Sequence, residues 1–178
     1  MKFFSGFSLK NDQRFFEPLL KKTDYTVTGF SYGAIKALEY TESLLRNSKR
    51  VDTLQLFSPA FFQTKSVQFQ KLQLRAYQKD EALYLKNFIK ACFAPYEQDK
   101  ISHTSHALEE LEELLSYKWN LDTLSEISRR GVHIEVYLGS EDKIIDAQGA
   151  REFFKEVATV TLFNGANHFL QRKGEENE

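Results

Sequence analysis

Short apolar segments alternate with helical patterns at both ends of the chain. From Tyr32 onward, apolar residues recur at helical spacing, with Ala34, Leu38 and Leu45 on one face. Segments rich in β-forming residues predict strands at 1–4, 25–28, 53–57, 134–138 and 159–163. Helical patterns beginning at Asn11-Asp12 and covering 147–157 lie between successive strands. This alternation predicts an α/β fold with a mainly parallel sheet.

The middle of the chain has helical periodicity and no strand pattern. Apolar residues share helical faces at Leu85, Phe88, Ile89 and Cys92, at Leu108, Leu111 and Leu115, and at Leu121, Leu124 and Ile127. The last pattern stops at Arg129-Arg130-Gly131, a typical helix exit. We therefore expect about five strands, with a helical cap inserted between the third and fourth. The expected core is 1–60 and 131–178, and the expected cap is 61–130.

One motif carries candidate chemistry. Gly29-Phe30-Ser31-Tyr32-Gly33 matches G-x-S-x-G, between a predicted strand and a predicted helix. A serine at such a sharp turn needs small residues two positions before and after it, because strand and helix approach closely there. Its hydroxyl then projects at a helix N-terminus, where backbone N–H groups favour a developing oxyanion. The pattern predicts a nucleophilic Ser31.

Two further residues follow in the order that such a nucleophile requires. Asp142 comes after the strand at 134–138, and His168 comes after the strand at 159–163. A serine hydroxyl needs an imidazole base, and the imidazole needs a carboxylate to orient it. Loops at the carboxyl ends of parallel strands meet at one edge of the sheet. We therefore expect Ser31, His168 and Asp142 to form a catalytic triad.

Each assignment has a plainer alternative. Ser31 would serve equally as a simple helix N-cap. Glu141 is the alternative acid, with Asp142 then a turn residue, and His168 would otherwise be an exposed loop histidine. For the oxyanion we expect the backbone N–H of Tyr32 and, from the loop after the first strand, that of Phe7. The alternative for the Phe7 loop is an ordinary turn.

Composition and charge narrow the function further. The 178 residues suit one domain, and a net charge of −1 gives no reason to expect a nucleic-acid partner. The single cysteine excludes an internal disulfide. The sequence has no secretory pattern and no apolar run of about 20 residues. We therefore expect a cytoplasmic protein with no membrane contact. Cys92, His103 and His106 are weak support for zinc, so we expect no metal and no cofactor.

The sequence resembles the α/β-hydrolases, and more closely the compact BioV-type pimeloyl-[acyl-carrier protein] methyl ester esterases of biotin synthesis. The resemblance runs nearly end to end. The segments that carry it are Phe3-Phe4-Ser5-Gly6-Phe7, Gly29 to Ala37, Leu56-Phe57-Ser58-Pro59, Lys71-Leu72-Gln73-Leu74, Gln78-Lys79-Asp80, Leu111-Glu112-Glu113-Leu114-Leu115, Ile134-Glu135-Val136 and Asn167-His168.

The resemblance implies hydrolysis of the methyl ester on a pimeloyl chain carried by acyl carrier protein, with Ser31 as nucleophile, His168 as base and Asp142 as acid. It also implies a minimal α/β-hydrolase fold, since typical relatives have strands before the one that enters the oxyanion loop. Typical relatives carry a histidine where this chain has Ser5, which is a departure at the second oxyanion donor.

The predicted cap has segregated charge. Basic residues dominate 63–90 and acidic residues dominate 97–126. Acyl carrier proteins are acidic, so Lys71, Arg75 and Lys79 are candidate docking residues. The alternative is that the two halves of the cap pair with each other. Four aromatic residues of the cap are expected to line an acyl channel or to pack in the core: Phe61, Phe62, Phe69 and Trp119.

Two other functions use the same residues. An acyl thioesterase or a general carboxylesterase passes through the same serine acyl-enzyme, and only its products differ. A catalytically inactive hydrolase fold that binds acyl carrier protein is the alternative outside the enzymes.

Overall fold

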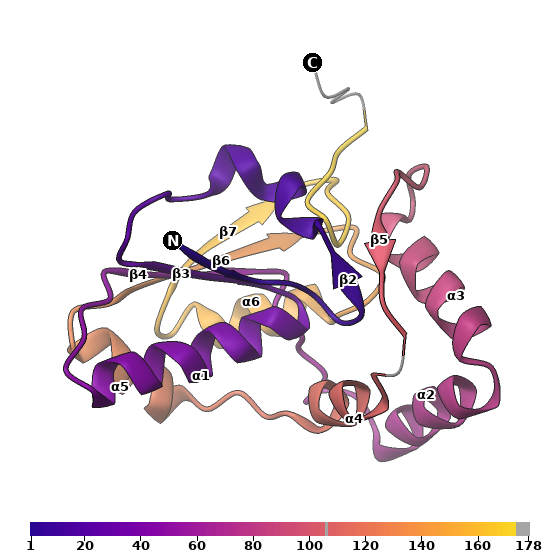
Figure 1. The fold of residues 1–178 in the computed structure, drawn as a ribbon, viewed down its shortest axis with the longest axis horizontal. Helices are drawn as coiled ribbons and strands as arrows, with labels where there is room; N and C mark the ends of the chain where they lie inside the picture. The colour runs from indigo at the N-terminus through magenta and orange to yellow at the C-terminus, as the bar shows by residue number, and fades with distance from the viewer. Residues whose placement is uncertain (106, 174–178) are drawn as a thin grey trace.

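The computed structural model describes residues 1–105 and 107–173, and its core is a five-stranded parallel sheet (Figure 1). The strand order is β1-β3-β4-β6-β7, and every neighbouring pair is parallel. The strands are β1 (Lys2–Phe4), β3 (Thr26–Phe30), β4 (Thr53–Phe57), β6 (His133–Gly139) and β7 (Thr159–Phe163). A separate antiparallel pair joins β2 (Leu9–Lys10) to β5 (Ser102–His103).

The helices are short. They are the 3₁₀ helix η1 (Asp12–Leu19) and the α-helices α1 (Tyr32–Arg46), α2 (Val67–Lys79), α3 (Glu81–Phe93), α4 (Leu108–Ser116), α5 (Leu121–Arg129) and α6 (Ala147–Phe154). The longest, α1, has 15 residues. Over the part of the chain that the structure describes, no helix has both the length and the apolar character needed to cross a membrane.

The predicted architecture is confirmed. The sheet has five parallel strands, and the helical insertion lies between β4 and β6, its third and fourth strands along the chain. The helix predicted from Asn11-Asp12 is present as the 3₁₀ helix η1, with Asn11 at its N-cap position but without a capping bond from its side chain. One local prediction was wrong in extent: the helix expected over 147–157 ends at Phe154.

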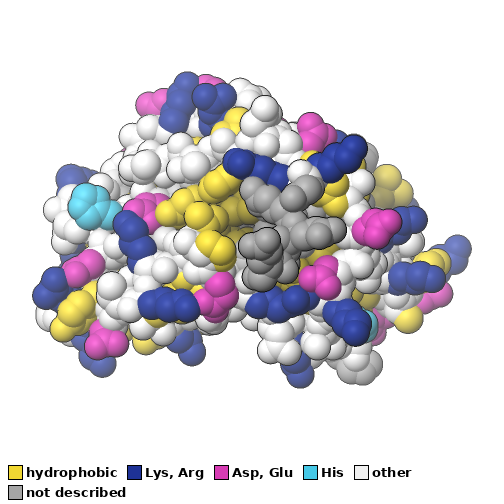
Figure 2. Space-filling view, turned by 90° about the horizontal axis from the view of Figure 1, so that it is seen from above, with side chains coloured by type: hydrophobic (Ala, Val, Ile, Leu, Met, Phe, Trp, Pro, Cys, Tyr) yellow, Lys and Arg dark blue, Asp and Glu magenta, His cyan; other side chains and the backbone are white. Residues whose placement is uncertain are grey.

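Each face of the sheet has its own core. Alternate residues of β4 and β6, such as Leu54, Leu56, Val136 and Leu138, pack toward α1, α5 and α6. The intervening residues face η1 and the C-terminal segment, where aromatic rings including Phe30 and Phe57 are buried. Figure 1 shows α1, α5 and α6 below the sheet and η1 above it. The face above the sheet is seen in Figure 2, where hydrophobic side chains remain visible among charged ones.

The helices of the insertion lie in two separate parts of the molecule. Helices α2, α3 and α4 lie beyond the carboxyl ends of the strands, whereas α5 lies beside α1 (Figure 1). Arg130, just after α5, donates to the Leu45 carbonyl of α1 at 2.6 Å. The division of the chain into a core and a cap at 61–130 stays a prediction.

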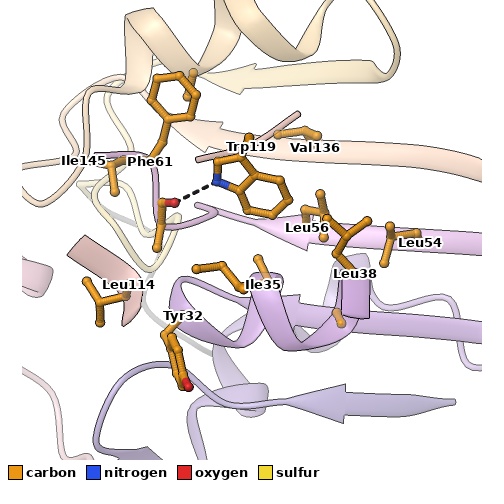
Figure 3. Close-up of a cluster of buried hydrophobic side chains, with 14 of the residues drawn as sticks. Tyr32, Ile35, Leu38, Leu54, Leu56, Phe61, Leu114, Trp119, Val136 and Ile145 are labelled. Atoms are coloured by element: carbon orange, nitrogen blue, oxygen red, sulfur yellow. Dashed lines mark hydrogen bonds between the residues drawn. The ribbon is translucent and has the colours of Figure 1, made fainter. Parts of the chain in front are cut away.

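Two of the four aromatic residues proposed for an acyl channel pack in the core instead. Trp119 is buried and its indole N–H donates to the Ala60 carbonyl at 2.8 Å, drawn as the dashed line in Figure 3. Phe61 is buried against Phe153 and Phe154. For these two rings the core-packing alternative holds.

Candidate active site

Ser31 occupies a strained turn between β3 and α1. Its backbone has φ 53° and ψ −115°, a conformation that non-glycine residues rarely adopt. A Cβ on Gly29 would lie 2.1 Å from the Gly33 carbonyl oxygen, and one on Gly33 would lie 2.1 Å from the Phe4 carbonyl oxygen. Both glycines are therefore required by close backbone approach, for the steric reason that the motif predicts.

His168 and Asp142 meet Ser31 above the carboxyl ends of the strands. His168 Nε2 lies 3.1 Å from Ser31 Oγ, and His168 Nδ1 lies 2.6 Å from Asp142 Oδ2. The His168 and Asp142 side chains are fully buried, and Ser31 is 4% exposed. The structure thus brings the three predicted residues into one continuous hydrogen-bonded chain, with each imidazole nitrogen bonded to one partner.

The geometry separates Asp142 from its neighbour. The second oxygen of Asp142 accepts the Ile144 and Ile145 backbone N–H groups at 2.7 and 3.1 Å, which fixes the carboxylate toward His168. Glu141 points to solvent and pairs with Lys143 at 3.0 Å. The other plain alternatives also disagree with the structure: Ser31 makes no side-chain capping bond, and His168 is not exposed.

Two buried polar residues that the sequence did not single out hold the histidine loop. The Asn167 carboxamide donates to the Phe93 carbonyl at 2.9 Å and accepts the N–H groups of Phe169 and Gln171 at 3.0 Å each. The Ser58 hydroxyl donates to the carbonyl of His168 at 2.8 Å. Their positions beside His168 and after a predicted strand were the available signals, but buried partners cannot be read from sequence.

Both candidate oxyanion donors have free backbone N–H groups. Tyr32 is the first residue of α1, where helical N–H groups have no intrahelical acceptor. Within residues 1–105 and 107–173, no acceptor is bonded to the N–H of Tyr32 or of Phe7. The Phe4 and Ser5 carbonyls pack directly on Gly33, so the loop that contains Phe7 lies against the turn at Ser31.

The Tyr32 side chain joins the nucleophile helix to the insertion. Its hydroxyl donates to Glu113 of α4 at 2.5 Å, and Lys36 donates to both oxygens of the same carboxylate at 2.7 and 2.8 Å. Burial and the Glu113 carboxylate raise the pKa of Tyr32. Figure 3 shows the Tyr32 hydroxyl directed away from the buried cluster of which the ring is part. We call Tyr32, Lys36 and Glu113 the α1–α4 clasp.

An apolar cavity of about 250 Å³ adjoins the site. Its wall includes Phe7 and Ile144, whose N–H is held by the Asp142 carboxylate. Phe62 and Phe69 also line it, as the acyl-channel interpretation predicts for those two rings. The remaining lining residues are Gln73, Tyr84, Asn87, Phe88, Ala91, Leu111, Leu114, Leu115 and Lys143. Burial raises the pKa of Tyr84 to about 12.

The three candidate docking residues lie on the outer face of α2. Lys71, Arg75 and Lys79 are all exposed, at four-residue spacing that places them in a row. Leu72, the next residue after Lys71, is 62% exposed. No acidic side chain of the described residues is paired with these three cations. The alternative, in which the two halves of the cap pair with each other, is not seen for them.

The residues considered for zinc do not converge among those described. Cys92 is buried in α3, where burial raises the pKa of its thiol well above the usual value, and His103 is exposed in β5. His106 lies outside the described residues. Among residues 1–105 and 107–173, no group of three His, Cys, Asp or Glu side chains is arranged to hold a metal ion.

Comparison with known proteins identifies the fold. No protein-family model and no curated protein matches the chain. Among solved structures, an esterase (EaEST) from Exiguobacterium antarcticum matches with a TM-score of 0.60 at 20% identity, covering 86% of this chain and 62% of that one. Naproxen esterase (carboxylesterase NP) from Bacillus subtilis matches with a TM-score of 0.51 at 19% identity, over 82% of this chain and 53% of its own.

BioG from Haemophilus influenzae matches with a TM-score of 0.56 at 12% identity, and here the coverage is 94% of this chain and 87% of the other. The chain therefore spans 62% and 53% of the length of the two esterases but 87% of the length of BioG. At these identities the similarity defines the fold, and the chain has the α/β-hydrolase fold in a small form.

Proposed function

We propose that this protein is a serine carboxylesterase. One observation carries the proposal: the hydrogen-bonded chain from Asp142 through His168 to Ser31, with the serine at a strained turn and two free backbone N–H groups nearby. The names of the structural neighbours, which include an esterase and a carboxylesterase, agree with this chemistry.

The geometry supports acyl transfer through a covalent intermediate. Ser31 Oγ attacks the ester carbonyl carbon while its proton passes to His168 Nε2, which lies 3.1 Å away. The Asp142 carboxylate stabilises the imidazolium, and the N–H groups of Tyr32 and Phe7 bind the oxyanion. The ester C–O bond breaks, and the leaving alcohol takes the proton from His168. Water then repeats these steps on the acyl-enzyme and releases the acid.

The nucleophile is tested by turnover of a small nitrophenyl ester by wild-type protein and Ser31→Ala. Loss of the nucleophile should reduce kcat by about 10⁶-fold, since members of such a triad act as a unit. The matched control is Ser128→Ala, an exposed serine of α5 outside the triad and the oxyanion loop. Unchanged turnover in Ser31→Ala would exclude the proposed enzyme class.

The finer proposal is that the substrate is the methyl ester of pimeloyl-acyl carrier protein. The apolar cavity beside Asp142 suits a chain of methylenes, each of which gains about 0.8 kcal/mol on burial. Its wall includes Phe69 of α2 and Phe88 of α3, and the outer face of α2 carries the three cations that have no acidic partner within the described chain. A carrier protein docked on that face would present its acyl arm next to the cavity.

The substrate is tested by incubation with a methyl-ester acyl carrier protein and with a matched acyl thioester that lacks the ester. The proposal expects release of methanol from the first and no free thiol from either. Release of free thiol would identify a thioesterase, and release of neither by a protein that turns over small esters would identify a carboxylesterase with other substrates.

Docking is tested by the charge reversals Lys71→Glu, Arg75→Glu and Lys79→Glu in one variant. The KM for the carrier-bound ester should rise at least tenfold and depend less on salt, while a small free ester is turned over normally. The matched control reverses three exposed cations of the core helices and their ends, Arg46, Lys49 and Arg151. Equal effects of the two variants would refute specific docking.

A further inference from the structure

A buried acid lies beneath the loop that contains the second oxyanion donor. Asp12, the first residue of η1, is 0% exposed. Its Oδ2 accepts the backbone N–H of Gly6 at 2.8 Å, and its Oδ1 is buried without a hydrogen-bond partner among the described residues. Burial raises the pKa of Asp12, and the Ser5 hydroxyl and the Gly6 N–H oppose that rise.

A carboxylate in this position is unfavourable for stability alone. Removing a charged group from water is expensive unless it is fully paired, and here only one of two oxygens is paired. The surrounding core is aromatic: Phe16, in the same helix, packs on Phe30 and Phe57. An apolar side chain would avoid this cost but would leave the Gly6 N–H without its acceptor, so the bond to Gly6, and not packing, accounts for an acid here.

The rest of the loop is fastened on both sides of Phe7. The Leu9 N–H donates to the Gly6 carbonyl at 3.0 Å, which closes a turn in which Ser8 has a positive φ of 55°. The Ser8 carbonyl accepts the Thr104 N–H at 2.8 Å, beside the β2–β5 pairing. The N–H and carbonyl of Gly6 and the carbonyl of Ser8 are thus all bonded, whereas the N–H of Phe7 is free in the described chain.

We propose that Asp12 is a positioning residue for oxyanion binding: by holding the Gly6 N–H it fixes the Ser5–Gly6 peptide, and together with the Leu9 N–H bond to the Gly6 carbonyl this directs the Phe7 N–H at the oxyanion formed at Ser31. This inference rests on the proposed serine esterase. The acid touches neither substrate nor the reacting atoms and acts only through the backbone. A loop with a preset donor stabilises the transition state without reorganising during the reaction.

The test compares Asp12→Ala, which removes the acceptor, with Asp12→Asn, which keeps an acceptor oxygen in the same place. Active sites are first counted by complete phosphonylation, so that unfolded protein does not enter kcat. Asp12→Ala should lower kcat by about 10- to 10³-fold with little change in KM, up to the loss of a whole oxyanion donor. Its affinity for a trifluoromethyl ketone should fall by a similar factor. Asp12→Asn should restore most of both.

A purely structural role gives a different result. The matched control is Thr41→Ala, which removes a buried hydroxyl that donates to the Ala37 carbonyl inside α1. It should lower the melting temperature without changing kcat per active site. If Asp12→Ala behaves like this control, or if Asp12→Asn is as impaired in kcat as Asp12→Ala, the inference is overturned.

One further variant covers the case in which Asp12→Ala does not fold. Replacing Gly6 by glycolic acid exchanges the amide for an ester and deletes only the N–H that Asp12 holds. It should reproduce the loss of kcat, and an unchanged kcat would overturn the inference. Ser31→Ala distinguishes failure of the proposed function from failure of this inference. If Ser31→Ala is inactive while Asp12→Ala and the Gly6 ester variant have normal kcat, the serine esterase stands and only the role of Asp12 is refuted.

Discussion

The α1–α4 clasp should contribute measurably to stability, and Glu113→Ala tests it. The substitution removes one carboxylate that accepts from the Tyr32 hydroxyl and from the Lys36 ammonium. Hydrogen bonds to charged groups contribute about 1.5–3 kcal/mol when partly buried, and exposed ion pairs contribute about 0.2–1 kcal/mol. The Lys36 and Glu113 side chains are 32% and 35% exposed, between these cases. We therefore expect a loss of about 2 kcal/mol.

A loss of this size is visible in thermal unfolding. For a chain of this length, 1 kcal/mol corresponds to about 2–4 °C, so the melting temperature should fall by about 4–8 °C at neutral pH. The matched control is Glu112→Ala, the exposed neighbour on α4, which should change stability by less than about 0.5 kcal/mol. Because α4 carries three leucines of the cavity wall, KM for long-chain esters should rise in Glu113→Ala.

The pH dependence gives the sharper test. Partial burial acts to raise the pKa of Glu113, but hydrogen bonds from Lys36 and Tyr32 outweigh it and hold the pKa below its ordinary 4.5. A lowered folded-state pKa means that the contribution is complete above the unfolded value and is lost as pH falls through the folded value. The difference between wild type and Glu113→Ala should therefore narrow below about pH 4.5. Equal melting temperatures for the two variants at pH 7, or a difference that does not change with acid, would refute the reasoning.

The remaining predictions concern the site and its cavity. Asp142→Asn should lower kcat by about 10⁴-fold while Glu141→Gln stays near wild type, and the reverse in an ester assay would make Glu141 the acid. Ala91→Phe should fill the cavity and exclude about four methylenes, whose burial contributes ~3 kcal/mol. The kcat/KM for heptanoyl esters should therefore fall ~100-fold relative to that for acetyl esters. An equal fall for both esters would place the acyl chain elsewhere. Gly33→Ala should destabilise the fold by at least ~1–3 kcal/mol, because its Cβ would overlap the Phe4 carbonyl, and an unchanged melting temperature would contradict the close approach.

Sequence patterns predicted the sheet and the approach of the three site residues well, because both depend on local rules. A strand that ends in G-x-S-x-G determines a sharp turn, and parallel strands bring their following loops to one edge. The sequence did not decide whether Asp142 or Glu141 is the acid of the triad, because two adjacent loop residues differ only in the direction in which their side chains point. That direction is set by the Ile144 and Ile145 N–H groups, which hold Asp142 toward the imidazole.

Long-range contacts account for what the sequence did not predict. Asp12 is a polar residue at a predicted helix start and Asn167 lies in a loop, and nothing local indicates that each is fully buried and bonded to backbone. Trp119 and Phe61 belong to the predicted cap, yet both pack in the main core: Phe61 follows β4 closely, and Trp119 comes just before α5. The two-residue strands β2 and β5 are too short for any periodicity to reveal.

The central claim is that Ser31 is a nucleophile activated by His168. Its most direct test is labelling with a fluorophosphonate, followed by mass measurement of the intact chain and of its peptides. We predict one phosphonyl group per chain, located on Ser31, absent from Ser31→Ala and formed far more slowly in His168→Ala. Undiminished labelling of Ser31→Ala, or a label located on another residue of the wild-type protein, would contradict the account.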